Sequence, residues 1–100
     1  MMKHLKIKDH QAGTTYEGLG FFIEVNHQPM DLINATIVMV LTSSAGQQTT
    51  MDLDIIDVRG KFWIKRQIIT LAVDSYSFEI EITKGNGDVK KYIIGQWRIR

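Results

Sequence analysis

The clearest alternation of apolar and polar positions in the chain lies between residues 76 and 83. Every second residue there is apolar: Tyr76, Phe78, Ile80 and Ile82. A period of two is typical of a β-strand with one buried side and one side facing water. Asn86-Gly87 follows, and this pair favours a type I′ turn, in which both central residues have positive φ. The pattern therefore predicts a hairpin that closes the chain.

A two-residue loop at Asn86-Gly87 would also fix how the two strands of this hairpin pair. It places Phe78 opposite Gly95 and brings the apolar residues of both strands to one face. The exception is Lys91, a charged residue that falls on the apolar face near the turn. A shift by one residue would move Glu79 into the core, so the pattern determines the register well.

Other stretches with alternating or continuous apolar residues predict the remaining strands. These stretches cover residues 3–8, 19–26, 35–42, 50–58 and 61–65. The lysines of residues 3–8 suit an edge strand, because charged side chains discourage pairing with other chains. Residues 35–42 are apolar on both faces, which indicates a central strand or one covered by a partner. Residues 67–73 fit either a strand or an irregular connector.

The number and spacing of these stretches indicate the fold class. About seven strands, separated by turn signals every 8 to 12 residues or so, are typical of an antiparallel β-sandwich. Tyr76 fits two interpretations: a tyrosine corner of an immunoglobulin-like sandwich, whose hydroxyl bonds back to the preceding connection, or simply the first inward aromatic residue of its strand. We predict an all-β, immunoglobulin-like sandwich in a single domain, residues 1–100.

Composition and charge limit the possible partners. The chain has 100 residues, of which 44% are hydrophobic, and this is enough for a two-layer core. A net charge of +1 provides no strong field, so we expect neither a nucleic-acid nor a membrane partner. No cysteine is present, which excludes a disulfide framework. We expect no signal peptide, because residues 1–8 are not followed by an apolar segment, and no apolar run approaches the ~20 residues that span a bilayer.

The titratable side chains do not have the spacing of a metal centre. The three histidines lie in the predicted edge strand and in two loops, without an i, i+4 spacing or a nearby cluster of carboxylates: His4, His10 and His27. Asp52, Asp54 and Asp57 could offer oxygen atoms to a divalent ion, but the loop pattern of calcium sites is absent. The polar face of a strand is the better interpretation of these aspartates. We predict no metal and no cofactor.

Two glutamates on one strand face are the remaining candidates for catalysis. Glu79 and Glu81 could form the carboxylate pair of a glycoside hydrolase. Opposite basic residues of the second hairpin strand, however, they fit better with a charge-paired, solvated sheet surface. We therefore predict that the chain has no catalytic residue and is not an enzyme.

A second set of apolar residues lies on positions that should face outward. These residues are Phe22, Val38, Val40, Trp63 and Ile94. A small sandwich has one interior, so a second apolar set indicates a protein–protein interface. Trp63 also belongs to a run of basic and aromatic residues, 61–66, such as single-strand nucleic-acid binders use, but the near-zero net charge favours an interface or the core for this side chain.

Several short motifs follow one another along nearly the whole chain. They are Lys6-Ile7-Lys8, Gly13-Thr14, Phe22-Ile23-Glu24-Val25, Pro29-Met30-Asp31-Leu32-Ile33-Asn34-Ala35-Thr36, Gly60-Lys61-Phe62-Trp63-Ile64, Tyr76-Ser77-Phe78-Glu79-Ile80, Asn86-Gly87-Asp88 and Ile94-Gly95-Gln96-Trp97. Their order resembles small immunoglobulin-like domains of phage and prophage tail proteins, including the N-terminal domain of the upper baseplate protein family. Ser75 stands where that family usually has glycine, and Asn86-Gly87-Asp88 replaces its simpler Asp-Gly turn.

The resemblance implies a function that the residues alone do not. Such domains are non-enzymatic building blocks, so it implies a structural protein of a phage tail or baseplate that is assembled in the bacterial cytoplasm. Its partners would be other phage structural subunits, and it would form a homo-oligomer. One alternative is a stand-alone ligand-binding module, for instance for carbohydrate, with Trp63 and Tyr92 as stacking aromatics. The other is a small hydrolase that uses Glu79 and Glu81.

Overall fold

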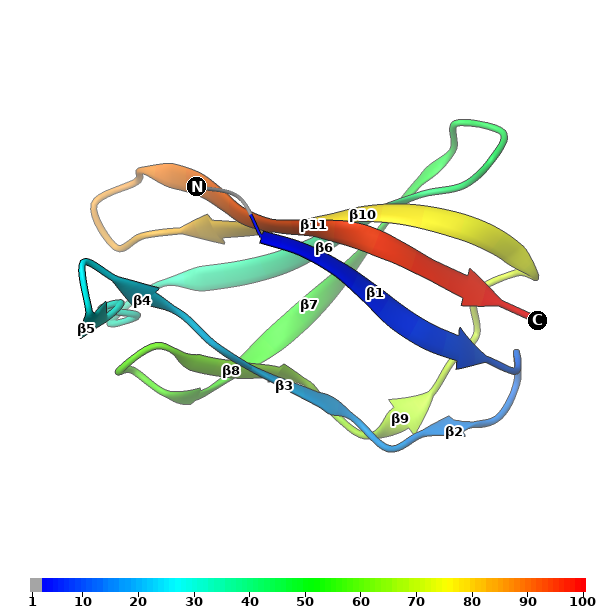
Figure 1. Cartoon of the computed structure of the whole chain (residues 1–100), viewed down its shortest axis with the longest axis horizontal. Helices are drawn as coiled ribbons and strands as arrows, with labels where there is room; N and C mark the ends of the chain where they lie inside the picture. The colour runs from blue at the N-terminus through cyan, green and yellow to red at the C-terminus, as the bar shows by residue number, and fades with distance from the viewer. Residues whose placement is uncertain (1–2) are drawn as a thin grey trace.

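The computed structural model describes residues 3–100, in which strands and irregular connections alternate without a helix. Seven strands form one sheet in the order β1-β11-β10-β6-β7-β8-β3 (Figure 1). Their bounds are Lys3–His10 (β1), Leu19–Phe22 (β3), Thr36–Thr42 (β6), Gln48–Asp57 (β7), Lys61–Ile64 (β8), Asp74–Thr83 (β10) and Val89–Ile99 (β11). Two short ribbons add β2 (Thr15–Tyr16) with β9 (Gln67–Ile68), and β4 (Glu24–Val25) with β5 (Gln28–Pro29). The described part of the chain thus contains no helix that could cross a membrane.

Strand β7 divides the sheet into two layers. Its first part, residues 48–53, pairs with β6, whereas Asp54 and the residues after it pair with β8. Figure 1 shows β7 crossing diagonally from the upper strands to the lower ones. The larger layer contains β1, β11, β10, β6 and the first part of β7, and the smaller layer contains the end of β7, β8 and β3. The all-β, sandwich-like architecture predicted from the sequence is confirmed.

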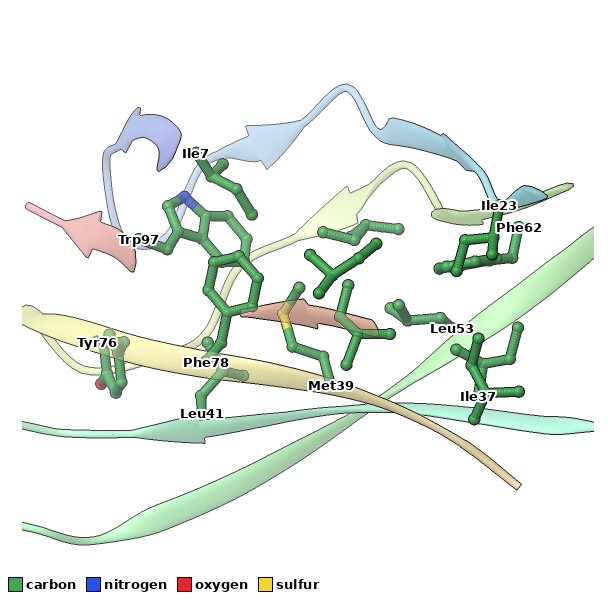
Figure 2. Packing of buried hydrophobic residues seen from close by; sticks show 14 of the residues in the cluster. Ile7, Ile23, Ile37, Met39, Leu41, Leu53, Phe62, Tyr76, Phe78 and Trp97 are labelled. Atoms are coloured by element: carbon green, nitrogen blue, oxygen red, sulfur yellow. The ribbon is translucent and has the colours of Figure 1, made fainter. Parts of the chain in front are cut away.

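The hydrophobic core lies between the two layers (Figure 2). The alternating residues of β10 point into it and are buried: Tyr76, Phe78, Ile80 and Ile82. Strand β6 lies between β10 and β7, as predicted for a central strand, and it buries Ile37, Met39 and Leu41. From the smaller layer, Phe62 stacks on Phe21 with ring centroids 5.0 Å apart. The period-two pattern therefore identified the inward residues of these strands.

Strand β1 pairs with β11 in parallel, so the prediction of a purely antiparallel sandwich is wrong at this edge. Parallel neighbours need a long connection, and between the first and last strands the whole intervening chain provides it. Gly95 of β11 lies opposite Leu5 and permits the close approach. A Cβ atom at Gly95 would overlap the carbonyl oxygen of Leu5 and lie 2.7 Å from Cζ of Phe78. The edge position of residues 3–8 is as predicted.

The C-terminal hairpin has the predicted register but a different turn. Phe78 faces Gly95, and the same register holds from Asp74 to Ile80. The loop, however, has three residues, 85–87, of which only Gly87 has positive φ, at 94°. The amide of Gly87 donates to the carbonyl of Lys84 at 2.9 Å, a pattern of a type I turn followed by a left-handed residue. The predicted type I′ turn at Asn86-Gly87 is therefore wrong.

A two-residue turn with positive φ at both positions occurs elsewhere in the chain. Asn26 and His27 have φ of 54° and 64° and connect β4 to β5. The strand predicted over 19–26 is interrupted at Ile23 and divided into β3 and β4, and the turn pairs β4 with β5. Both residues are polar, and asparagine tolerates the left-handed region better than most residues.

The hairpin also contains a β-bulge, which accounts for the charged residue in its apolar pattern. After Ile80, which pairs with Ile93, the next residue Glu81 pairs with Lys91, and Tyr92 is the extra residue. The one-residue offset turns Lys91 to the outer face, where its Nζ lies 2.9 Å from Glu79 Oε2. A β-bulge shifts the alternation of the remaining strand by one position. The mismatch at Lys91 was thus the sequence signal of the bulge.

Tyr76 forms a hydrogen bond back to the connection that precedes β10. The hydroxyl of Tyr76 donates a hydrogen bond of 2.7 Å to the backbone carbonyl of Ala72. Burial raises the pKa of Tyr76, so the hydroxyl keeps its proton and remains a donor. In the segment 67–73, only Gln67–Ile68 is a strand, and the rest is an irregular connector that this hydrogen bond holds against β10. This hydrogen bond is the one that the corner interpretation predicted, and Tyr76 is also the first buried aromatic residue of β10.

We expect Tyr76→Phe to lower the free energy of unfolding by about 1–2 kcal/mol, because it leaves the carbonyl of Ala72 without its donor. Urea denaturation measures this loss. Tyr92→Phe is the matched control, since the Tyr92 hydroxyl makes no hydrogen bond to the described part of the chain, and its stability should change little. Equal losses in both variants would contradict a specific role of the corner.

Candidate interaction surface

The outer face of the larger layer is hollowed along its middle. The hollow has a volume of about 690 Å³ and is lined by side chains from five strands. They include His4 and Lys6 from β1, Ile94 and Gln96 from β11, Ser77 and Glu79 from β10, Val40 and Thr42 from β6, and Gln48 from β7. These residues point outward because they alternate with the buried residues of the same strands. The face combines apolar, polar and charged groups.

The strand register arranges these side chains in rows across the sheet. One row runs from His4 through Ile94, Glu79 and Val40 to Thr50. Side chains in one row are direct neighbours on the sheet surface, about 4.5–5.5 Å apart at their Cβ atoms. The apolar residues Ile94 and Val40 therefore flank Glu79, and the face consists of mixed rows without a continuous apolar patch.

The carboxylates of this face are charge-paired with one lysine. Nζ of Lys91 lies 2.9 Å from Glu79 and 3.7 Å from Oε1 of Glu81. The hydrogen bond with Glu79, together with the charges of both carboxylates, raises the pKa of Lys91. Glu79 and Glu81 thus lie on a solvated, charge-paired surface, which is the arrangement expected from their cross-strand neighbours.

A second hollow of about 380 Å³ continues this face toward the ends of β1 and β11. Its walls carry the hydroxyl groups of Thr42, Ser43, Ser44, Ser75 and Ser77. Lys6 and Arg98 also line it, and neither makes an ion pair with another residue of the 3–100 range. The hydroxyl of Ser44 and the backbone amide of Ser75 lower the pKa of nearby Asp74. This end of the outer face therefore carries Lys6 and Arg98 near the carboxylates of Asp9 and Asp74, and the Glu-Lys-Glu cluster lies on its other side.

The five candidate interface residues divide between two surfaces. Val38, Val40 and Ile94 are half-buried on the outer face of the larger layer. Phe22 and Trp63 belong to the outer face of the smaller layer, where Phe22 is 51% exposed. Trp63 packs beside Gly18, at which a Cβ atom would lie 3.4 Å from its ring. The structure therefore brings three of these residues together and separates the other two from them.

The side chains considered as metal ligands also lie apart. Asp54 pairs with Lys65 at 3.5 Å, and Asp57 pairs with Arg59 at 3.2 Å. The hydrogen bond from Arg59 lowers the pKa of Asp57. His10 accepts or donates a hydrogen bond at 3.1 Å with the hydroxyl of Thr14. Within residues 3–100, no three histidine or carboxylate side chains are close enough to hold a metal ion together.

The two aromatics of the carbohydrate-binding alternative occupy different places. Trp63 faces outward from β8, whereas Tyr92 lines a third hollow of about 280 Å³ beside β3 and β1. Tyr92 reaches this position because it is the bulge residue of β11, which the regular alternation of the sequence did not show. The apolar residues around this hollow were not recognised as a site from the sequence.

Comparison with known proteins gives information on the fold alone. No protein-family model and no curated protein matches the chain. Among solved structures, CopC from Methylosinus trichosporium OB3b is similar, with a TM-score of 0.50 and 10% sequence identity. The similarity covers 91% of this chain and 82% of CopC. It supports the β-sandwich architecture of this chain. It carries no information on function, because the sequence identity is only 10%.

Proposed function

We propose that the chain is a non-enzymatic assembly module that pairs with a second copy of itself through the outer face of its larger layer. The observation that carries this proposal is the hollowed face in which Val40 and Ile94 flank Glu79. Interfaces typically combine apolar contacts with a polar rim and specific hydrogen bonds. Half-buried aliphatic side chains beside a charge-paired carboxylate suit a protein contact, although this face of the single subunit is open to water.

The charges of this face favour a second copy as the partner. Lys6 and Arg98 provide unpaired positive charge near one end of the face, and Glu79 and Glu81 provide negative charge beside Lys91. In a two-fold dimer, the same patch on both subunits must be complementary to itself. A face that carries both signs in separate places meets this requirement, because a two-fold axis can bring the basic end of one copy to the acidic side of the other.

We further propose that the module is an immunoglobulin-like structural subunit of a phage or prophage tail or baseplate. The order of the motifs from Pro29 to Trp97 supports this setting, and the hydrogen bond between Tyr76 and Ala72 supports the immunoglobulin-like assignment. A two-fold pair through this face would be one of the contacts that such a subunit makes in an assembly of many copies.

The test is the solution mass across a concentration series, measured by light scattering. We expect a defined oligomer for the wild-type protein and a shift toward the monomer in Val40→Arg, which adds a charge in the middle of the face. Phe22→Arg is the matched control, because it adds the same charge on the smaller layer and should leave the oligomer unchanged. A monomer at every concentration, or an oligomer that only Phe22→Arg dissociates, would overturn the proposal.

A further inference from the structure

Strands β1 and β3, at the two ends of the sheet order, face each other across a gap that no strand pairing closes, and we call this gap the seam. Strands β1 and β3 each have one neighbour in the sheet, and no ladder joins them. The hollow of about 280 Å³ lies between them. It is lined by the six consecutive residues 19–24, by Lys3 and Leu5 of β1, and by Tyr92 and Ile93 of β11. Because consecutive residues of β3 line it, the hollow runs along the free backbone edge of this strand.

The backbone groups that point into the seam can be assigned from the hydrogen bonds of β3. The amide of Ile23 donates to the carbonyl of Gly60 at 2.9 Å, which is on the β8 side. Successive residues of a strand direct their N–H and C=O groups to opposite edges. Leu19 and Phe21 therefore point toward β8, as Ile23 does, and Gly20 and Phe22 point toward the seam. The edge offers two donors and two acceptors.

The walls of the seam are apolar, and its rim carries one charge of each sign. Leu5, Leu19, Phe21 and Ile93 contribute hydrocarbon surface, and the bulge at Tyr92 adds an aromatic ring. Lys3 lines one side and Glu24 the other. Neither makes an ion pair with any residue of the described range, 3–100. A guest that carries one acidic and one basic residue would complement both.

We propose that this seam binds an extended segment of a partner protein, which is added as a strand along β3. The free N–H and C=O groups of Gly20 and Phe22 would pair with the guest backbone, and every second guest side chain would enter the apolar hollow. Such strand addition takes its affinity from main-chain hydrogen bonds and its specificity from pockets for alternate side chains. The hollow of about 280 Å³ follows the edge of a single strand, so it fits a linear segment and not a folded domain. This site is separate from the outer face of the larger layer and does not depend on self-association.

The experiment uses capped heptapeptides in which valine, leucine or phenylalanine alternates with threonine, with a lysine at one end and a glutamate at the other. They are titrated into isotope-labelled protein and followed by NMR. We expect amide shift changes concentrated at residues 19–24, 3–5 and 92–93. Replacing the central threonines of the guest by proline removes backbone donors and should weaken binding about tenfold or more. Equal binding of the proline peptides, shifts confined to other surfaces, or no shift with any peptide of the set would overturn the proposal.

A matched pair of variants at one position tests the edge itself. Gly20→Pro removes the N–H that points into the seam and should abolish binding, and it should leave the fold intact because proline is tolerated on a free edge. Gly20→Ala keeps the N–H, and its Cβ would meet no atom within 4 Å, so binding should persist. Circular dichroism verifies that both variants are folded. If a folded Gly20→Pro still binds the peptides, strand addition along β3 is wrong, whatever the oligomeric state of the protein.

Discussion

Gly95→Ala should destabilise the protein by about 3 kcal/mol or more, which is at the upper end of what overpacking causes. The added methyl group would overlap the carbonyl oxygen of Leu5 and lie 2.7 Å from Cζ of Phe78. A phenylalanine ring can shift, but the carbonyl belongs to the backbone of β1, which is fixed along β11 from Lys3 to Ile7. The strain can therefore be relieved only if β1 moves away from β11.

Two measurements test this expectation. Thermal or urea denaturation gives the loss of stability, and hydrogen exchange shows whether the amides of β1 lose protection first, as detachment of this strand requires. Gly20→Ala is the matched control, because a Cβ there has open space and the substitution should change stability by less than about 1 kcal/mol. Similar losses in the two variants would show that Gly95 is not a point of close strand contact.

Phe62→Ala should cost about 3–5 kcal/mol, the range measured for removal of a fully buried aromatic ring. Phe62 is completely buried and stacks on Phe21 at an interplanar angle of 15°. This contact joins a side chain of β8 to a side chain of β3 within the part of the core that the smaller layer covers. The loss of the ring leaves a cavity that the surrounding strands can only partly fill.

The control for this substitution is Phe22→Ala, which removes the same ring from the neighbouring strand. Phe22 is 51% exposed on the outer face of the smaller layer, so its removal should cost about 1 kcal/mol or less. Chemical denaturation with guanidinium distinguishes the two variants. A loss in Phe22→Ala as large as that in Phe62→Ala would mean that the ring of Phe22 is covered in solution, for example by a second copy.

Much of this fold could be predicted from the alternation of apolar residues. The inward sets of β10 and β6 follow a period of two, and burial of one face is the dominant constraint on where such strands can lie. The pairing of Phe78 with Gly95 followed from the same argument. The position of Tyr76 after an irregular connection likewise indicated the hydrogen bond to Ala72 as one of two possibilities.

The features that could not be predicted occur where one stretch of sequence allows more than one backbone geometry. Gly85-Asn86-Gly87 can form a two-residue or a three-residue loop, and the choice decides whether Lys91 falls inside or outside. The direction of β1 depends on which strand it meets at the edge, and a short stretch such as Leu5-Lys6-Ile7 has the same alternation in either direction. The local pattern identifies a strand but not its neighbour.

The candidate interaction surface could also be predicted only in part, because the local pattern does not tell which strands are neighbours. The outward positions of Val38 and Val40 could be predicted from the alternation within β6, but the faces on which Phe22 and Trp63 lie depend on how the sheet folds over at β7. Because the sheet folds over at β7, Phe22 and Trp63 lie on a different face from Val38 and Val40, whereas a flat sheet would have placed all four on one face. The seam beside Tyr92 depends on a bulge, and a bulge leaves only a weak trace in the sequence.

The parallel pairing of the first and last strands has a consequence for mechanical load. Lys3, where β1 begins, and Ile99, where β11 ends, lie at opposite ends of this pair, because the two strands run in the same direction. A force that pulls these ends apart therefore shears the ladder from Lys3 to His10 along its length and loads its hydrogen bonds together. An antiparallel pair at the same place would instead open one bond at a time. Tension applied between Lys3 and Ile99 is therefore opposed by the whole β1–β11 ladder.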